Sequence, residues 1–222
     1  MGLHLQWNEL AMPRLRYLKA VCRVRRGKVL SLRQKINVEP MHSRSLELNS
    51  YPLDEDRIIV EGWLKDERFK RGYGLDGQER KEGLVHHMGV RLLVGGMPPT
   101  ILDAEAEMSH VPHGLCHSTR ESVKKVIGLV IKSGFGEVVH KIIGGVEGCA
   151  HLAHLVMVMG QEAVHGYWTH KLASQPPAPR PFEEIEGLSY VINSCSLWRE
   201  DGPLHREIKA TLSTSANPPR KK

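Results

Sequence analysis

Cysteine and histidine side chains gather in two short segments of the sequence that could bind a metal. Residues 108–117 hold Cys116 among three histidines, and residues 148–151 hold the pair Cys149 and His151. Thiolate and imidazole are ligands that suit zinc and iron, whereas magnesium and calcium prefer oxygen. The two segments therefore predict a transition-metal site, for zinc or iron in preference to copper.

The predicted ligands come from distant parts of the chain. They are His86, Cys116, Cys149, His151 and Cys195. The histidine at 86 lies on an expected strand with its imidazole facing inward, where it needs a partner or a metal. His87 follows it, so the sequence leaves open which of the two points at the site. The spacings match no zinc-finger pattern. The alternative interpretation is a set of buried, unliganded thiols and scattered histidines.

Four segments that must position these residues have the pattern of β-strands. Each is rich in β-branched or aromatic residues or alternates apolar with polar ones, and turn residues separate them. We expect them at residues 44–51, 56–64, 84–94 and 100–108. The charged, glycine-punctuated segment 65–83 is expected to be a loop.

Three helices are predicted after the strands. Ser118 and Glu121 have the spacing of a capping box, which predicts a helix start near Thr119. A second helix is expected at residues 134–143, and the longest begins at Cys149 and reaches about His170. Strands followed by helices indicate an α+β fold. We therefore expect an antiparallel sheet of about four strands, followed by three helices packed on one face.

Charge and composition suggest how the chain is organised. Residues 1–45 carry ten Lys or Arg and two Glu, a local charge of +8, whereas the whole chain carries +6. The expected organisation is a basic N-terminal extension (1–43), an α+β core domain (44–172), a Pro-rich linker (173–181), a C-terminal covering segment (182–212) and a disordered tail (213–222). Because the rest of the chain is slightly acidic, no nucleic acid is expected on the core domain.

Several classes of protein are excluded by pattern. Every apolar run is too short for a transmembrane helix, and the first thirty residues lack the pattern of a secretory signal. Four cysteines are too few for a disulfide framework. The sequence also lacks Walker, Rossmann and serine-triad motifs. We therefore expect a cytoplasmic protein whose chemistry depends on cysteine and histidine.

The candidate ligands lie within motifs that resemble a bacterial family known only as a domain of unknown function. These motifs are Val85-His-His-Met, Pro112-His-Gly-Leu-Cys, Gly148-Cys-Ala-His and a late segment around Cys195. The resemblance implies that the family's His-x-Met histidine corresponds to His86, and that its cysteines correspond to Cys116, Cys149 and Cys195. The chain departs from the family pattern at His87 and Ala150, and neither change removes a candidate ligand.

The same part of the chain distantly resembles iron–sulfur scaffold proteins of the NifU/IscU type. Asp103-Ala-Glu-Ala leads to Cys116, Gly128 and Cys149 in the order that the scaffolds show. The resemblance implies a NifU/IscU-like fold and an iron–sulfur cluster as a further cofactor. Histidine ligands would favour a stable zinc or iron site over a cluster that is handed on.

Three classes of function stay open. The first is a metal-binding protein that delivers or senses zinc, iron or a cluster, with an undefined metal-accepting partner. The second is a small metal-dependent enzyme, a hydrolase or lyase acting on a small organic substrate, with Glu105, Glu107 or His113 as acid–base group. The third is a binding module without metal. An open coordination position beside a pocket would distinguish the second class from the first.

Overall fold

The computed structural model describes residues 31–173, 182, 185 and 188–215. The chain divides into two units, residues 1–39 and 40–222. The described part of the first unit contains the short helix α1 (Leu32–Lys35), whose start is closed by a capping box between Ser31 and Gln34. The segments predicted to be the Pro-rich linker and most of the N-terminal extension lie outside the described residues.

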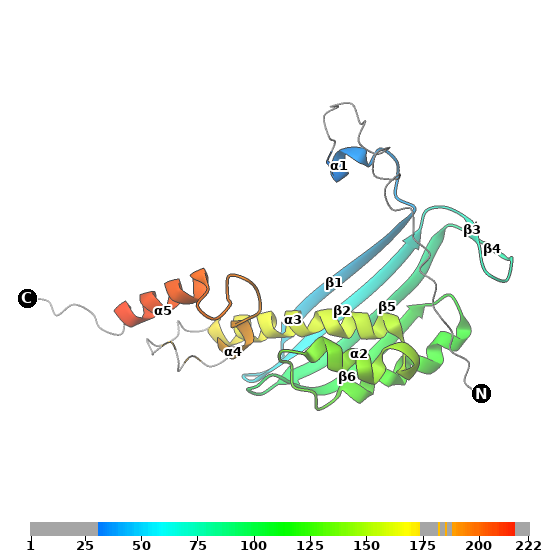
Figure 1. Cartoon of the computed structure of the whole chain (residues 1–222). Coiled ribbons are helices and arrows are strands. Elements are labelled where there is room, and N and C mark those ends of the chain that lie inside the picture. Colours follow the sequence, from blue (N-terminus) through cyan, green and yellow to red (C-terminus); the bar gives the residue numbers. More distant parts are fainter. Residues whose placement is uncertain (1–30, 174–181, 183–184, 186–187, 216–222) are drawn as a thin grey trace, which may run out of the picture. The chain divides into compact units, whose positions relative to one another are not determined.

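The second unit contains the predicted antiparallel sheet. Its four strands are β1 (His42–Pro52), β2 (Arg57–Arg68), β5 (Gly83–Gly95) and β6 (Thr100–His110), in the order β1-β2-β5-β6. Each pairs antiparallel with its neighbour (Figure 1). The prediction of a four-stranded antiparallel sheet is therefore confirmed.

Strand β2 continues beyond its predicted end at Leu64. Residues 65–68 were expected in a loop, but they pair with β1 on one side and with β5 on the other. The segment between β2 and β5 also contains a small hairpin, β3 (Gly72–Tyr73) and β4 (Glu79–Arg80). The loop prediction was wrong here because backbone pairing on both sides stabilises a run of charged residues in the extended conformation.

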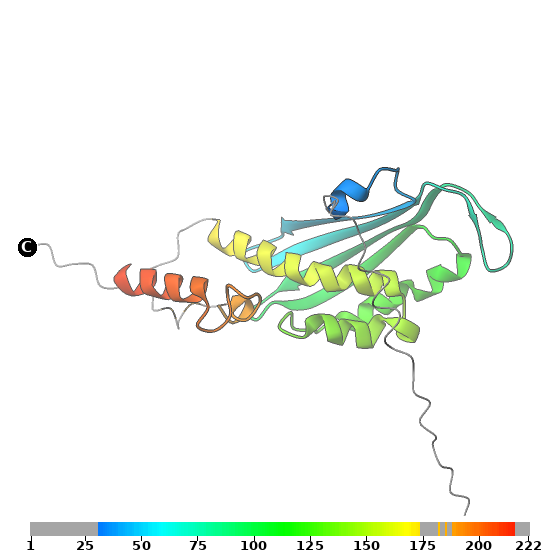
Figure 2. The same cartoon turned by 45° about the horizontal axis from the view of Figure 1, so that its top comes forward.

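Helices cover one face of this sheet (Figures 1 and 2). They are the 3₁₀ helix η1 (Gly114–Val126), α2 (Phe135–Ile143), the short 3₁₀ turn η2 (Gly145–Glu147) and α3 (Ala150–Leu172). The predicted α+β class, with strands before helices, is thus confirmed. No helix among the described residues has the length and apolar content that a membrane span needs.

The first helix begins earlier than predicted. It starts at Gly114 rather than near Thr119, because the Ser118 hydroxyl donates to the Leu115 carbonyl oxygen at 2.8 Å within the helix instead of capping a new start. The Glu121 carboxylate pairs with the neighbouring Lys124 ammonium. The long helix, in contrast, begins as predicted, with Cys149 as its N-cap residue.

Two further helices follow in the C-terminal part, α4 (Leu188–Val191) and α5 (Pro203–Ser215). The second includes residues 213–215, which were expected to belong to a disordered tail. In the segment predicted to be a covering element, the Phe182 ring contacts the His205 ring edge-on, at a centroid distance of 4.8 Å.

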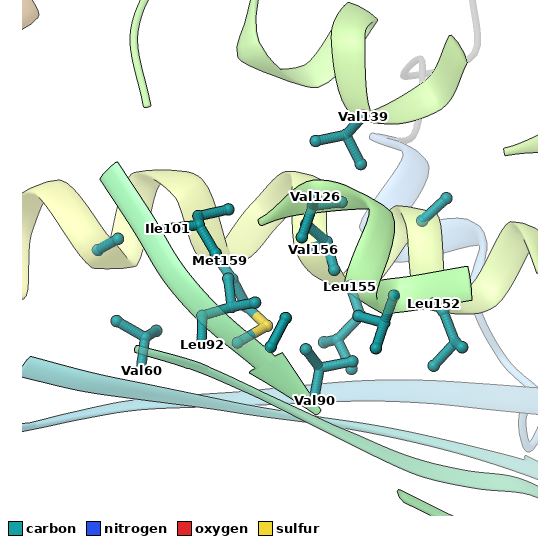
Figure 3. Packing of buried hydrophobic residues seen from close by; sticks show 14 of the residues in the cluster. Val60, Val90, Leu92, Ile101, Val126, Val139, Leu152, Leu155, Val156 and Met159 are labelled. Carbon is teal, nitrogen blue, oxygen red and sulfur yellow. The ribbon is translucent and has the colours of Figure 1, made fainter. Parts of the chain in front are cut away.

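The hydrophobic core lies between the sheet and the helices. Side chains from the helix-facing side of the strands interdigitate with those of η1, α2 and α3 (Figure 3). The residues drawn there include Val60, Val90, Leu92, Ile101, Val126, Val139, Leu152, Leu155, Val156 and Met159. Each such side chain contributes about 1.5–3 kcal/mol by its burial. This packing places the first turn of α3 near the C-terminal end of β2 and the N-terminal end of β5.

Glycine at position 62 permits the close approach of α3 to β2. A Cβ atom at this position would lie 2.8 Å from Met159 Sδ and 3.0 Å from a Leu48 methyl carbon. We expect Gly62→Ala to lower the free energy of unfolding by about 1–2 kcal/mol, because the added methyl group overpacks the core. Urea unfolding measures the change. Gly72→Ala is the matched control, since a Cβ there meets nothing within 4 Å, and an equal loss in both variants would contradict the prediction.

Candidate metal site

A row of polar residues crosses three neighbouring strands at one end of the sheet. Arg44 on β1, Asp66 on β2 and His86 on β5 are direct partners in the strand register. They continue the face that carries Leu64 and Met88, which is the face covered by helices. The core face of the sheet therefore ends in charged and imidazole side chains instead of apolar ones.

The Asp66 carboxylate is the centre of this row, and the residue as a whole is 1% exposed. Arg44 donates to it with two parallel bonds, Nε to Oδ1 and Nη2 to Oδ2, both 2.7 Å long. His86 Nδ1 lies 2.9 Å from Oδ2. The Arg44 hydrogen bonds lower the pKa of Asp66 and outweigh the effect of burial, and the His86 contact lowers it further. The contacts therefore favour the ionised carboxylate.

His151, in the first turn of α3, brings a second imidazole to the same carboxylate. Its Nε2 atom lies 4.0 Å from Asp66 Oδ2, and its ring centroid lies 4.0 Å from that of His86. Burial lowers the pKa of His86, and the nearby His151 lowers it further against the opposing effect of Asp66. A neutral imidazole is the form that binds metal ions.

Asp66, His86 and His151 together form a group that could hold a metal ion. Each offers one ligand atom, and these atoms all lie within 4.8 Å of one another. Within the described ranges, this is the one group of three or more His, Cys, Asp or Glu side chains that meets this condition.

Two predicted ligands, His86 and His151, thus meet in space. The structure also resolves the choice that the sequence left open between His86 and its neighbour. His87 lies on the opposite face of the sheet, where its ring stacks on Trp63 at a centroid distance of 4.7 Å. His86 therefore points at the site, and His87 does not.

Cys149 lies beside this group without belonging to it. Its Sγ atom is half-buried and 4.0 Å from His151 Nδ1, the nitrogen on the other side of that ring from Asp66. Burial raises the pKa of the thiol, but the His151 contact and the backbone N–H groups of His151 and Leu152 outweigh it, so the pKa is lowered overall. This is the effect expected for a cysteine at a helix N-terminus.

The other two predicted cysteine ligands are outside the group. Cys116 lies half-buried in η1, and Cys195 is exposed between α4 and α5. Neither is one of the three residues that meet at Asp66. Metal ligation by Cys116, Cys149 or Cys195 stays a prediction.

The acidic residues suggested as acid–base groups are elsewhere. Glu105 and Glu107 bind the Arg91 guanidinium at 3.3 Å, on the face of the sheet that carries Trp63. That is the face opposite the helices, so neither residue lies beside Asp66, His86 and His151. The alternation of side chains along β6 places them there.

Asp66 is the residue that sequence analysis missed. It lies in a charged run, Lys65-Asp-Glu-Arg68, which hides the strand period. A signal was nevertheless present. Ile58, Val60, Gly62 and Leu64 recur at every second position on the core face, and the next position in that series is Asp66. A carboxylate at a core position needs a partner, which makes it a candidate for a site.

Comparison with known proteins identifies part of the chain. Residues 42–165 match a family described as "Protein of unknown function (DUF2889)". No curated protein and no solved structure matches the chain significantly. The matched segment contains Arg44, Asp66, His86, Cys149 and His151, so the whole polar row lies within it. The expected likeness to NifU/IscU scaffold proteins is not confirmed.

Proposed function

The chain belongs to the DUF2889 family, and we propose that it is a metal-binding protein that holds zinc or ferrous iron at Asp66, His86 and His151. The observation that supports this proposal best is the approach of a buried carboxylate and two imidazoles within 4.8 Å. Two histidines and one carboxylate form a donor set that catalytic zinc sites and non-haem ferrous sites both use.

The distances between the donor atoms suit a metal with small adjustments. Metal–nitrogen and metal–oxygen bonds near 2.0–2.2 Å place tetrahedral ligand atoms about 3.3–3.6 Å apart. The Asp66 Oδ2 atom lies 2.9 Å from His86 Nδ1 and 4.0 Å from His151 Nε2. One pair must separate and the other must close by about half an ångström, which small side-chain rotations can supply.

Arg44 supports the carboxylate in this proposal. Its two hydrogen bonds use one lone pair on each Asp66 oxygen, and an ionised carboxylate has about four acceptor sites, so positions remain for a metal. Such outer contacts commonly fix the orientation of metal ligands. The guanidinium also offsets the carboxylate charge. Affinity would then depend on coordinate bonds to nitrogen, which favours transition metals over magnesium or calcium.

Metal analysis of the full chain, purified without a histidine tag, tests the proposal. We expect about one equivalent of zinc or iron per chain, and a higher melting temperature after the EDTA-treated protein is reloaded with Zn²⁺, or with Fe²⁺ under anaerobic conditions. A chain that carries no metal and whose melting temperature does not respond to either ion would contradict the proposal.

A metal-dependent enzyme, either a hydrolase or a lyase, is the second candidate function. The observation that favours it is the number of ligands, since three protein ligands leave at least one coordination position for water or a substrate. Cobalt(II)-substituted protein can test this. Acetohydroxamate should change the visible absorption spectrum of the cobalt if a position is open, and an unchanged spectrum would argue for a closed site.

Replacing Cys149 with serine should weaken metal binding without abolishing it. The thiol lies behind His151, on the side of the ring away from Asp66, so we expect it to orient this histidine. Loss of such an orienting contact lowers affinity about tenfold. A chelator competition titration measures the change, with Cys195→Ser as the control. Complete loss of metal would instead make Cys149 a ligand.

A further inference from the structure

A groove runs between β1 and the C-terminal half of α3, away from the candidate metal site. It has a volume of about 400 Å³. Its lining includes Leu48, Ser50, Tyr51, Glu162, His165 and Thr169. Glu162 lies eleven residues after His151, which is about 16 Å along a helix. The groove is therefore a separate feature of the same helix.

Its lining comes from the margin of the face that α3 presents to the sheet. The buried stripe of the helix stays apolar in the second half, where it includes Ala163 and Tyr167. Beside that stripe, Glu162, Gly166 and Thr169 occupy positions one turn apart and line the groove. A side chain at Gly166 would collide with the Ser50 hydroxyl. The glycine thus lets the helix and β1 come together at the base of the groove.

Glu162 brings a carboxyl group to this groove, and His165 also lines it. The residue is half-buried, and its Oε1 atom accepts a hydrogen bond of 2.6 Å from the Ser50 hydroxyl. No lysine or arginine in the described part of the chain forms an ion pair with it at 4.0 Å or less. One carboxylate oxygen is therefore available, because Ser50 binds only the other. A half-buried carboxylate without a cation gains most from a ligand that brings one.

We propose that this groove binds a small organic molecule with a primary ammonium group on an apolar body. The ammonium would donate to the open Glu162 oxygen, and the apolar body would contact Leu48 and Ile58, which line the groove from the helix-facing side of the sheet. A metal ion fits less well, because Glu162 and His165 belong to no group of three ligands among the residues that the structure describes. The proposal is independent of the metal site.

A nitrogen-15 NMR titration of the full chain with benzylamine tests this inference. We expect shifts confined to amides of β1 and the second half of α3, and a dissociation constant of about 1 mM, as is usual for a ligand of this size. Benzyl alcohol and benzoate have the same ring without the cation and should bind at least tenfold more weakly.

Glu162→Gln should weaken benzylamine binding at least tenfold while its amide spectrum shows a folded protein, because the amide keeps an oxygen for Ser50 but loses the charge. Asp103→Asn, at an exposed position of β6, is the matched control and should bind like the unchanged protein. The proposal is overturned if Glu162→Gln keeps full affinity, if benzoate binds as tightly as benzylamine, or if the shifts map to other elements.

Discussion

Replacing His151 with alanine is expected to lower the affinity of the protein for zinc by about 100-fold or more. In the proposed site the imidazole would supply one of three protein ligands, and two ligands hold a divalent ion poorly. It is also the residue that α3 contributes to the group, so its loss would disconnect a bound ion from the helix layer. Competition with a chromophoric chelator measures the affinity, and His86→Ala should give a loss of similar size.

His154→Ala is the matched control for this experiment. The residue lies on the same helix, three positions later, and is not part of the ligand group. Zinc affinity in this variant should stay within about threefold of the unchanged protein. Equal losses in the His151 and His154 variants would mean that zinc binds elsewhere on α3, and the proposed ligand set would have to be abandoned.

Removing Arg44 should destabilise the metal-free protein more than removing its partner Asp66. Arg44→Ala leaves a carboxylate whose side chain is 2% exposed without its main donor, and we expect a loss of about 3 kcal/mol in the free energy of unfolding. Asp66→Ala leaves a guanidinium that is 39% exposed and can turn to water, so a loss of about 1–2 kcal/mol is expected.

Urea unfolding in the presence of EDTA measures both losses. The double variant should be no less stable than Arg44→Ala alone, because the unpaired carboxylate is then also gone. Arg57→Ala is the control for an exposed pair. Its partner Asp54 is 40% exposed, and the loss should stay below about 1 kcal/mol. Equal losses for Arg44→Ala and Arg57→Ala would contradict a buried role for the row.

The elements were predictable from sequence because local patterns determine them. Alternation of apolar residues located the four strands, and the apolar stripe after Cys149 located α3, whose N-cap is Cys149. Length was less predictable where a long-range partner decides it. Strand β2 extends to Arg68 because β1 and β5 pair with it, and no local pattern in the charged run carries that information.

The site was only half predictable for the same reason. His86 and His151 stand out by residue type, but their meeting depends on where α3 crosses the sheet, which core packing decides. Cys116 and Cys195 were predicted as ligands because thiolates bind metals and because of their order in the sequence. The order of residues in the sequence does not determine which segments lie beside Asp66 in the folded chain. Asp66 was missed because a buried carboxylate looks like a surface residue in a charged segment.

The polar row would also determine how the edge of the sheet responds to a metal bound at the proposed site. β1 is an edge strand, and it pairs only with β2 among the described strands. Arg44 connects this edge to Asp66, and through Asp66 to His86 and His151. An ion bound at the carboxylate would connect β2, β5 and α3. The Arg44 hydrogen bonds to Asp66 would connect the edge strand β1 to the same group. Fraying of β1 and release of the ion would then be linked equilibria. Fraying would promote release of the ion, and binding of the ion would oppose fraying.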